Sequence, residues 1–145
     1  MNTREYLWQV KALTLKIDQR QKQRLELESD ITGMKSIQYD SDRVQSSHRD
    51  SLCERITSLI SIQDEISGMI TEYLGFKSKI IGQIQDLSDT RYVALLYKRY
   101  IEFKRFEVIA IEMGYDFTYI RRLHNKALKA FEKKIHKDTE KRDII

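Results

Sequence analysis

A row of polar and basic side chains near the carboxyl end of the chain has the chemistry needed to contact nucleic acid. In a helix that begins at Phe117, a rotation of about 100° per residue gathers these side chains on one face: Thr118, Arg121, Arg122, Asn125 and Lys129. Arginine can donate two hydrogen bonds to a guanine edge, asparagine can pair with adenine, and threonine offers a hydroxyl or a methyl group. The spacing predicts a face that reads base edges. The alternative is a small helical domain whose solvated face is basic.

The residues around this face have the spacing of two helices that cross at a tight turn. Each helix has one apolar face. The faces consist of Phe106, Ile109, Ala110 and Met113, followed by Ile120, Leu123, Ala127, Leu128 and Phe131. Between them, Gly114 can take the left-handed conformation that ends a helix. Asp116 can then accept hydrogen bonds from the free N–H groups of the next helix. The sequence therefore predicts a helix-turn-helix.

A further helix, 91–103, is expected to support this turn. Ser88 or Asp89 can cap it. Its apolar residues should pack on the two crossing helices, which would otherwise have too little core to be stable. These residues are Val93, Leu96, Tyr97, Tyr100 and Ile101. Lys104 and Arg105 precede the first crossing helix, where side chains often reach the phosphate backbone, and Lys126 and Lys129 are expected to hold phosphates as well.

Three stretches of this segment resemble region 4 of the bacterial sigma-70 family, which reads the −35 promoter element. They are Tyr92–Tyr100, Phe106–Tyr115 and Ile120–Leu128, and the resemblance covers about 45 of the 145 residues. It implies base contacts by Phe117, Thr118, Arg121 and Arg122, and host RNA polymerase as a partner. With its helical N-terminal part, the whole chain is similar to phage regulators of Gram-positive bacteria of the ArpU and RinA type. The chain has no counterpart of sigma region 2, the part that melts the −10 element.

Two long helices are predicted before this segment. The first, 4–31, has apolar residues at alternating steps of four and three, interrupted by Arg20 and Arg24. This pattern indicates a coiled coil or, equally, an amphipathic helix packed on a neighbour. The second, 52–87, keeps the same steps over 36 residues. The polar segment 32–51 is expected to be a poorly ordered connection. The pattern leaves open whether the two helices pair within one chain or between chains.

Three glycines in the second long helix, Gly68, Gly75 and Gly82, recur every seventh residue away from its apolar seam. Each costs about 1 kcal/mol of helix stability relative to alanine. Their common face can admit another backbone closely, or it can be an exposed and bendable face. The spacing does not distinguish these two interpretations.

Composition and charge restrict the class of protein. The 145 residues include no proline and five glycines, and 33% are charged, which fits long helices. The range 89–145 has 14 Lys and Arg against 9 Asp and Glu, a net charge of +5, whereas 1–88 has 12 against 13, a net charge of −1. Such asymmetry is expected of a domain that neutralises phosphates.

Other classes of protein are not expected. The single cysteine, Cys53, cannot form an internal disulfide, which indicates a reducing compartment. With no apolar run of eighteen residues and no signal-peptide pattern at the start, we expect neither a membrane segment nor export, but the cytoplasm of a bacterial host cell. His48, His124 and His136 are isolated from each other and from paired carboxylates, so no catalytic site, metal site or cofactor is predicted.

The sequence thus predicts an all-α protein in three parts. A helical hairpin or coiled coil occupies 1–88 with a polar loop near 32–51, a helix-turn-helix DNA-binding domain occupies 89–135, and a charged, frayed tail occupies 136–145. The expected function is sequence-specific binding of double-stranded DNA by a phage or prophage transcription regulator, which forms homo-oligomers through its long helices. The alternative is a coiled-coil adaptor that binds another protein. The target sequence and the choice between activation and repression do not follow from the sequence.

Overall fold

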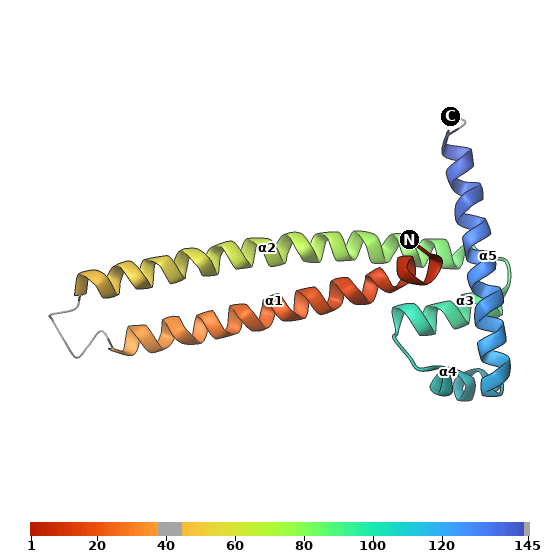
Figure 1. Ribbon diagram of the computed structural model, residues 1–145, viewed down its shortest axis with the longest axis horizontal. Coiled ribbons are helices and arrows are strands. Elements are labelled where there is room, and N and C mark those ends of the chain that lie inside the picture. Colours follow the sequence, from red (N-terminus) through yellow and green to blue (C-terminus); the bar gives the residue numbers. More distant parts are fainter. Residues whose placement is uncertain (38–44, 144–145) are drawn as a thin grey trace. The chain divides into compact units, whose positions relative to one another are not determined.

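The protein is all-helical throughout the part of the chain that the computed structural model describes, residues 1–37 and 45–143 (Figure 1). The elements are α1 (Thr3–Ile37), α2 (Gln45–Gln85), α3 (Thr90–Leu96), the π-helical segment η1 (Tyr97–Ile101), α4 (Phe106–Met113) and α5 (Phe117–Asp143). This confirms the predicted all-α class. The bounds of α4 and the start of α5 agree with the sequence prediction.

The chain forms two compact units. One, which we call the terminal unit, consists of Met1–Ala12 and Tyr73–Ile145, and the other, the paired-helix unit, consists of Leu13–Glu72. Both long helices contribute residues to both units. The start of α1 and the end of α2 therefore belong to the same unit as α3 to α5. The predicted domains 1–88, 89–135 and 136–145 do not contain this grouping.

In the paired-helix unit, α1 and α2 lie side by side and run in opposite directions (Figure 1). Ion pairs join Arg20 to Glu65 at 3.5 Å and Asp30 to Arg55 at 3.8 Å, as expected of two antiparallel helices. Its buried residues are Ile17, Ile31, Ile62 and Ile66. The two long helices thus pair within one chain, which the sequence pattern left open.

The predicted connection at 32–51 and the predicted frayed tail are wrong where the structure describes them. Helix α1 continues to Ile37 and α2 begins at Gln45, while residues 38–44 lie outside the described part. Polar side chains in these added helical turns contact backbone carbonyls of α1. The Thr32 hydroxyl donates to the Glu28 carbonyl, and a His48 ring nitrogen lies 3.0 Å from the Met34 carbonyl oxygen. His48 is accordingly half-buried.

The carboxyl-terminal helix likewise extends beyond the predicted end at residue 135. Helix α5 continues to Asp143, and the Thr139 hydroxyl donates to the Ile135 carbonyl at 2.9 Å. Ile135 packs against the buried core of the terminal unit, which anchors the added turns. A charged composition is compatible with helix because side chains three and four residues apart can pair in solvent.

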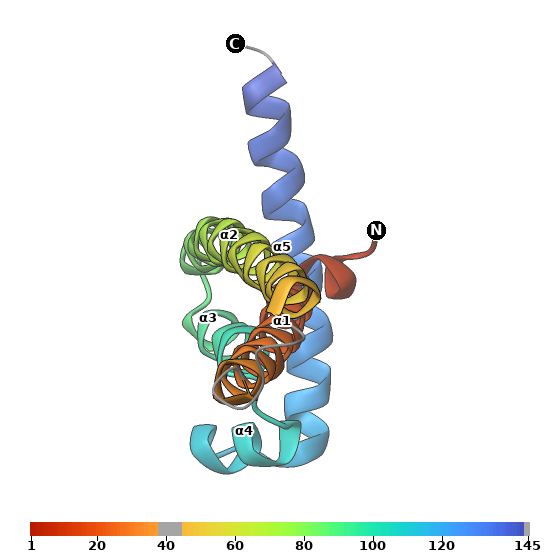
Figure 2. The ribbon, with the colours of Figure 1, turned by 90° about the vertical axis from the view of Figure 1, so that its left-hand side faces the viewer.

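The terminal unit contains two apolar cores. The first, the turn core, joins α3, α4 and α5, which lie together in both views (Figures 1 and 2). Its buried residues are Leu95, Ile109, Ala110, Ile120 and Leu123. The second, the junction core, joins the start of α1 and the end of α2 to α3, η1 and the middle of α5. Its buried residues are Leu7, Val10, Ile80, Ile84, Leu87, Leu96, Tyr100, Ile101, Ala127, Leu128 and Phe131.

The residues predicted to support the turn are confirmed in part. The predicted set, Val93, Leu96, Tyr97, Tyr100 and Ile101, packs in the junction core, which includes Ala127, Leu128 and Phe131 of α5. The prediction omitted Leu95, which is fully buried in the turn core, with the partly buried Tyr92 beside it. One apolar helix can face two cores, and helical periodicity in a short segment does not say which side meets which partner.

The predicted helix 91–103 also changes form midway. After α3, residues Tyr97–Ile101 are π-helical, and the Glu102 N–H donates to the Tyr97 carbonyl at 3.1 Å. Phe103 follows with a positive φ of 59°, a left-handed conformation that is unusual for a bulky residue. Its ring packs against the junction core, which supports the strained backbone.

The turn between α4 and α5 has the predicted local chemistry. Gly114 has φ 73°, and its N–H donates to the Ile111 carbonyl while the Tyr115 N–H donates to the Ala110 carbonyl at 3.0 Å. These two bonds form a Schellman motif. The Asp116 carboxylate accepts from the Tyr119 N–H at 2.8 Å and so caps α5. Asp89 caps α3 in the same manner through the Arg91 N–H.

A pair of glycine substitutions tests this account. Gly114→Ala should lower the free energy of unfolding by about 1 kcal/mol, because an L side chain is strained at positive φ. Gly75→Ala should raise it by up to about 1 kcal/mol, because Gly75 is helical and a Cβ added there meets no atom within 4 Å. Urea denaturation measures both. Effects of the same sign would contradict the assigned conformations.

The same open space surrounds Gly68 and Gly82. Within the described chain, no backbone approaches within 4 Å of a Cβ added at any of the three spaced glycines of α2.

Candidate nucleic-acid interface

The predicted base-reading side chains lie on the solvent side of α5. Exposed are Thr118, Arg121, Arg122 and Asn125, and so is Lys129, which is predicted to hold a phosphate. On the opposite side, Ile120 is fully buried and Leu123 is 3% exposed, both in the turn core. Burial of these two residues fixes the rotation of α5 about its axis. Phe117, at the first position of α5, is also exposed, with the Arg121 guanidinium 5.7 Å from its ring centre.

The positive charge on this side of α5 is not neutralised. Among the described residues, no carboxylate forms an ion pair with Arg121, Arg122, Lys126 or Lys129. We refer to these four residues as the basic face. Exposed cations without counter-charges attract an anionic polymer most strongly at low ionic strength.

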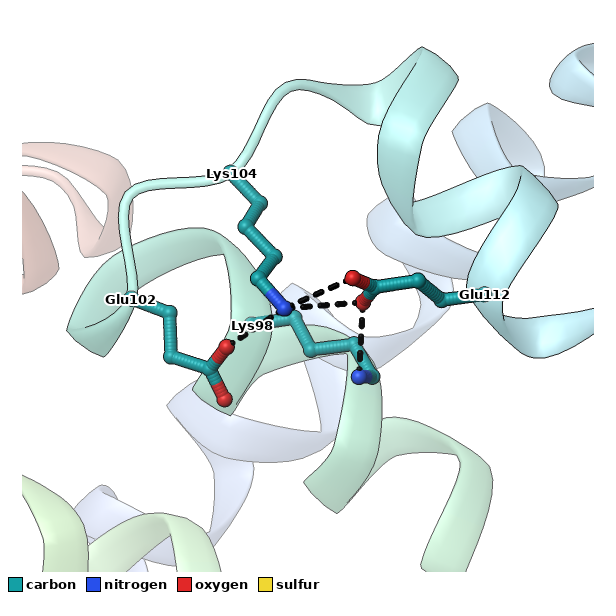
Figure 3. A network of polar contacts seen from close by, with 4 residues as sticks. All are labelled: Lys98, Glu102, Lys104 and Glu112. Atoms are coloured by element: carbon teal, nitrogen blue, oxygen red, sulfur yellow. Dashed lines mark hydrogen bonds and ion pairs between the residues drawn. The ribbon is translucent and has the colours of Figure 1, made fainter.

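Lys104 differs from these residues because it belongs to a network of four charged side chains (Figure 3). Its ammonium lies 2.8 Å from a Glu102 carboxylate oxygen and 2.7 Å from a Glu112 oxygen, and Lys98 donates to Glu112 at 2.8 Å. These contacts join η1, the loop after it and α4. Lys104, predicted to hold a phosphate, would share its charge with two glutamates while doing so. Arg105 is exposed and makes no cap bond to α4.

The network shifts the pKa values of Glu112 and Lys104 in the stabilising direction. Hydrogen bonds from Lys104 and then Lys98 lower the pKa of the Glu112 carboxyl. Hydrogen bonds to Glu102 and then Glu112 raise the pKa of Lys104. Lys104 is half-buried and Glu112 is exposed, and water screens such surface pairs, so the network orients the loop rather than contributing much stability.

The structure also brings together residues that the sequence analysis did not connect. A cavity of about 140 Å³ lies beside the basic face, lined by Arg4 and Trp8 of α1, Arg99 and Tyr100 of η1, Phe106 of α4, and Arg121, His124 and Asn125 of α5. Arg4 donates to the Asn125 side-chain oxygen at 3.3 Å, so one predicted base-reading amide contacts the N-terminal segment. The two residues are 121 positions apart. No local spacing in the sequence signals such a contact.

His124 and Tyr100 form a buried pair at the wall of this cavity. Tyr100 Oη lies 2.8 Å from His124 Nε2, and His124 is 4% exposed. Burial, and then the positive charges of Arg4 and Arg99, lower the pKa of His124 to about 4. Burial raises the pKa of the Tyr100 hydroxyl. Both groups are therefore neutral at pH 7, and the hydroxyl can donate to the imidazole.

The buried imidazole makes stability depend on pH. Between pH 6.5, the usual pKa of histidine, and about 4, the unfolded chain binds a proton at residue 124 that the folded chain does not. Stability from this source is complete above pH 6.5 and is lost as the pH falls through that window, by up to roughly 3 kcal/mol if the whole shift applies.

We expect His124→Gln to remove this part of the acid sensitivity. Urea denaturation from pH 7 to 4 should show a shallower loss of stability for His124→Gln than for the wild type, whatever the offset at pH 7. His136→Gln is a matched control, because His136 is exposed on the same helix. Equal slopes for His124→Gln and the wild type would contradict a neutral, buried His124.

Known proteins offer no further guide. No protein-family model, no curated protein and no solved structure matches the chain. Within residues 1–37 and 45–143, no three His, Cys, Asp or Glu side chains are grouped closely enough to hold a metal ion. The helices in these ranges include none that is both long and apolar enough to cross a membrane.

Proposed function

We propose that this protein is a sequence-specific DNA-binding transcription regulator whose segment α4–turn–α5 acts as a helix-turn-helix of the sigma-70 region 4 type. One observation carries the proposal. The predicted base-reading side chains are exposed on α5, next to cations with no described counter-charge, and the turn core holds that helix in one orientation. A helix about 10–12 Å across fits the major groove of B-DNA, which is about 12 Å wide.

The side chains divide into two roles by their positions on α5. Thr118, Arg121, Arg122 and Asn125 lie in the first three turns of the helix, the end that enters the groove in proteins of this kind, and would contact base edges. Phe117 joins them by its resemblance to the sigma family. Those assigned to phosphates are Lys104, Arg105, Lys126 and Lys129. Lys104 would be the weakest of them, because Glu102 and Glu112 already share its charge.

The long helices suggest how the regulator reaches useful affinity. A single module buries limited surface on DNA, which favours binding as an oligomer or with a partner protein. Leu15, Leu25 and Ile60 in the paired-helix unit are each more than half exposed and so are available to contact a further helix. We propose a homo-oligomer formed through these helices in the cytoplasm of a bacterial host. The same apolar residues favour the second candidate function, a helical adaptor for another protein.

The DNA proposal predicts a loss of sequence preference in a single variant. Random duplex DNA selected with the wild-type protein at two salt concentrations should yield a motif. Arg122→Ala should weaken binding to that motif about 5- to 150-fold and relax the preference at one base position, because a bidentate contact to guanine is lost. Arg142→Ala is the matched control, since Arg142 is exposed near the far end of α5.

Other outcomes of this selection separate the candidates. Salt-sensitive binding without a motif would restrict the contact to phosphates. Absence of binding at low salt by the folded protein would reject the DNA proposal in favour of the adaptor.

The resemblance to region 4 further suggests a contact with host RNA polymerase. We expect the purified protein to bind the host polymerase and to change transcription from a promoter that carries the selected motif near its −35 position. A pull-down and an in vitro transcription assay measure these two effects. If the protein binds its motif but neither binds polymerase nor changes transcription, the DNA proposal stands and the polymerase partner is rejected.

A further inference from the structure

The cavity beside the basic face is lined by three arginines from three separate elements. Arg4 comes from α1, Arg99 from η1 and Arg121 from α5. No aspartate or glutamate lines the cavity, and none of the three arginines forms an ion pair with a described carboxylate. Three like charges that face one space without a counter-charge repel one another, and a bound anion would relieve that repulsion.

Arg99 is held in place and has an unused donor. Its guanidinium carbon lies 4.2 Å from the centre of the Phe106 ring and 5.1 Å from the Trp8 ring, and one terminal nitrogen donates to the Lys104 carbonyl at 3.0 Å. The Nε atom is buried and has no hydrogen-bond partner. A buried donor without a partner is costly, so its retention points to a ligand.

The backbone around Arg99 is unusual as well. Arg99 and Tyr100 are neighbours in the π-helical segment, yet both line the cavity. Phe103, with its positive φ, follows shortly after. Single π-helical turns and strained residues concentrate at functional sites, because their cost must be offset by a role. These features are independent of the charges.

We propose that this cavity, the arginine pocket, binds a phosphate-type oxyanion. Planar guanidinium groups pair with phosphate oxygens through two parallel hydrogen bonds, and three arginines line this pocket. The Asn125 side-chain amide can donate a further bond. A volume of about 140 Å³ exceeds the roughly 30 Å³ that one water molecule occupies in the liquid, which leaves room for a phosphate group.

The phosphate group has two possible sources. It can belong to the backbone of a DNA duplex on α5, since Arg121 and Asn125 lie both on the predicted base-reading side and at the pocket. This source rests on the proposed function. It can also belong to a free phosphoanion, and the pocket then acts whether or not the protein binds DNA.

The chain has a built-in probe for the experiment. Trp8 is the only tryptophan of the chain. It lines the pocket, and the Arg99 guanidinium lies over its ring. Inorganic phosphate, titrated against sodium chloride at matched ionic strength, should change the fluorescence of the full-length protein along a saturable curve. Arg99→Gln and Arg4→Gln should each weaken this response at least about tenfold. Arg142→Gln should leave it unchanged, because Arg142 lies outside the pocket.

Arg99→Gln can disturb folding, because Arg99 is packed between two rings. Arg4→Gln should not, because the Arg4 side chain is exposed near the start of α1. Circular dichroism verifies that each variant is folded. The proposal is overturned if phosphate produces no saturable change beyond that of chloride, or if the response persists unaltered in both folded variants.

A DNA arm identifies the source. If the occupant is a backbone phosphate, a short duplex should itself change Trp8 fluorescence, phosphate should compete with it, and Arg4→Gln should weaken duplex binding while Arg142→Gln does not. If the occupant is free, the phosphate response should persist in the presence of saturating duplex. Phosphate binding without any DNA binding would keep the pocket and reject the proposed function. DNA binding with no phosphate response would keep the proposed function and reject the pocket.

Discussion

Burial of one side of α5 is the constraint on which the candidate interface depends. Ile120 and Leu123 are buried because the turn core packs them against Leu95 of α3 and Ile109 of α4. The left-handed Gly114 and the Asp116 cap allow α5 to begin immediately after α4 ends. Once these contacts form, the rotation of α5 is set, and its polar side must face solvent.

The junction core adds a second constraint, which joins the two ends of the sequence. Leu7 and Val10 of α1 pack with Ile80 and Ile84 of α2 and with Phe131 of α5. This packing also positions the neighbouring residues of α1: Arg4 donates to Asn125, and the Trp8 ring contacts Arg99. Apolar packing therefore gathers cations that would repel one another in the absence of that packing.

Charged residues near the turn fall into two groups with different physical roles. Lys98, Glu102, Lys104 and Glu112 neutralise one another and orient the loop before α4. The cations of the basic face have no described counter-charge. A count of Lys and Arg treats the cations of both groups alike, but only those of the basic face can contribute their full charge to the field around the protein.

The sequence by itself determined the features that depend on local chemistry. The bounds of α4, the left-handed Gly114, the cap at Asp116 and the exposed side of α5 all follow from hydrogen bonds and periodicity within a few residues. For α3 the sequence offered Ser88 and Asp89 as caps, and the structure selects Asp89. Tertiary structure alone decided the rest: Leu95 as the support of the turn, the π-helical form of η1, the pairing of Lys104 with two glutamates, and the arginine pocket. The reason is physical. Arg4 and Asn125 meet because apolar side chains elsewhere in α1, α2 and α5 share a core, and no pattern near either residue encodes that contact.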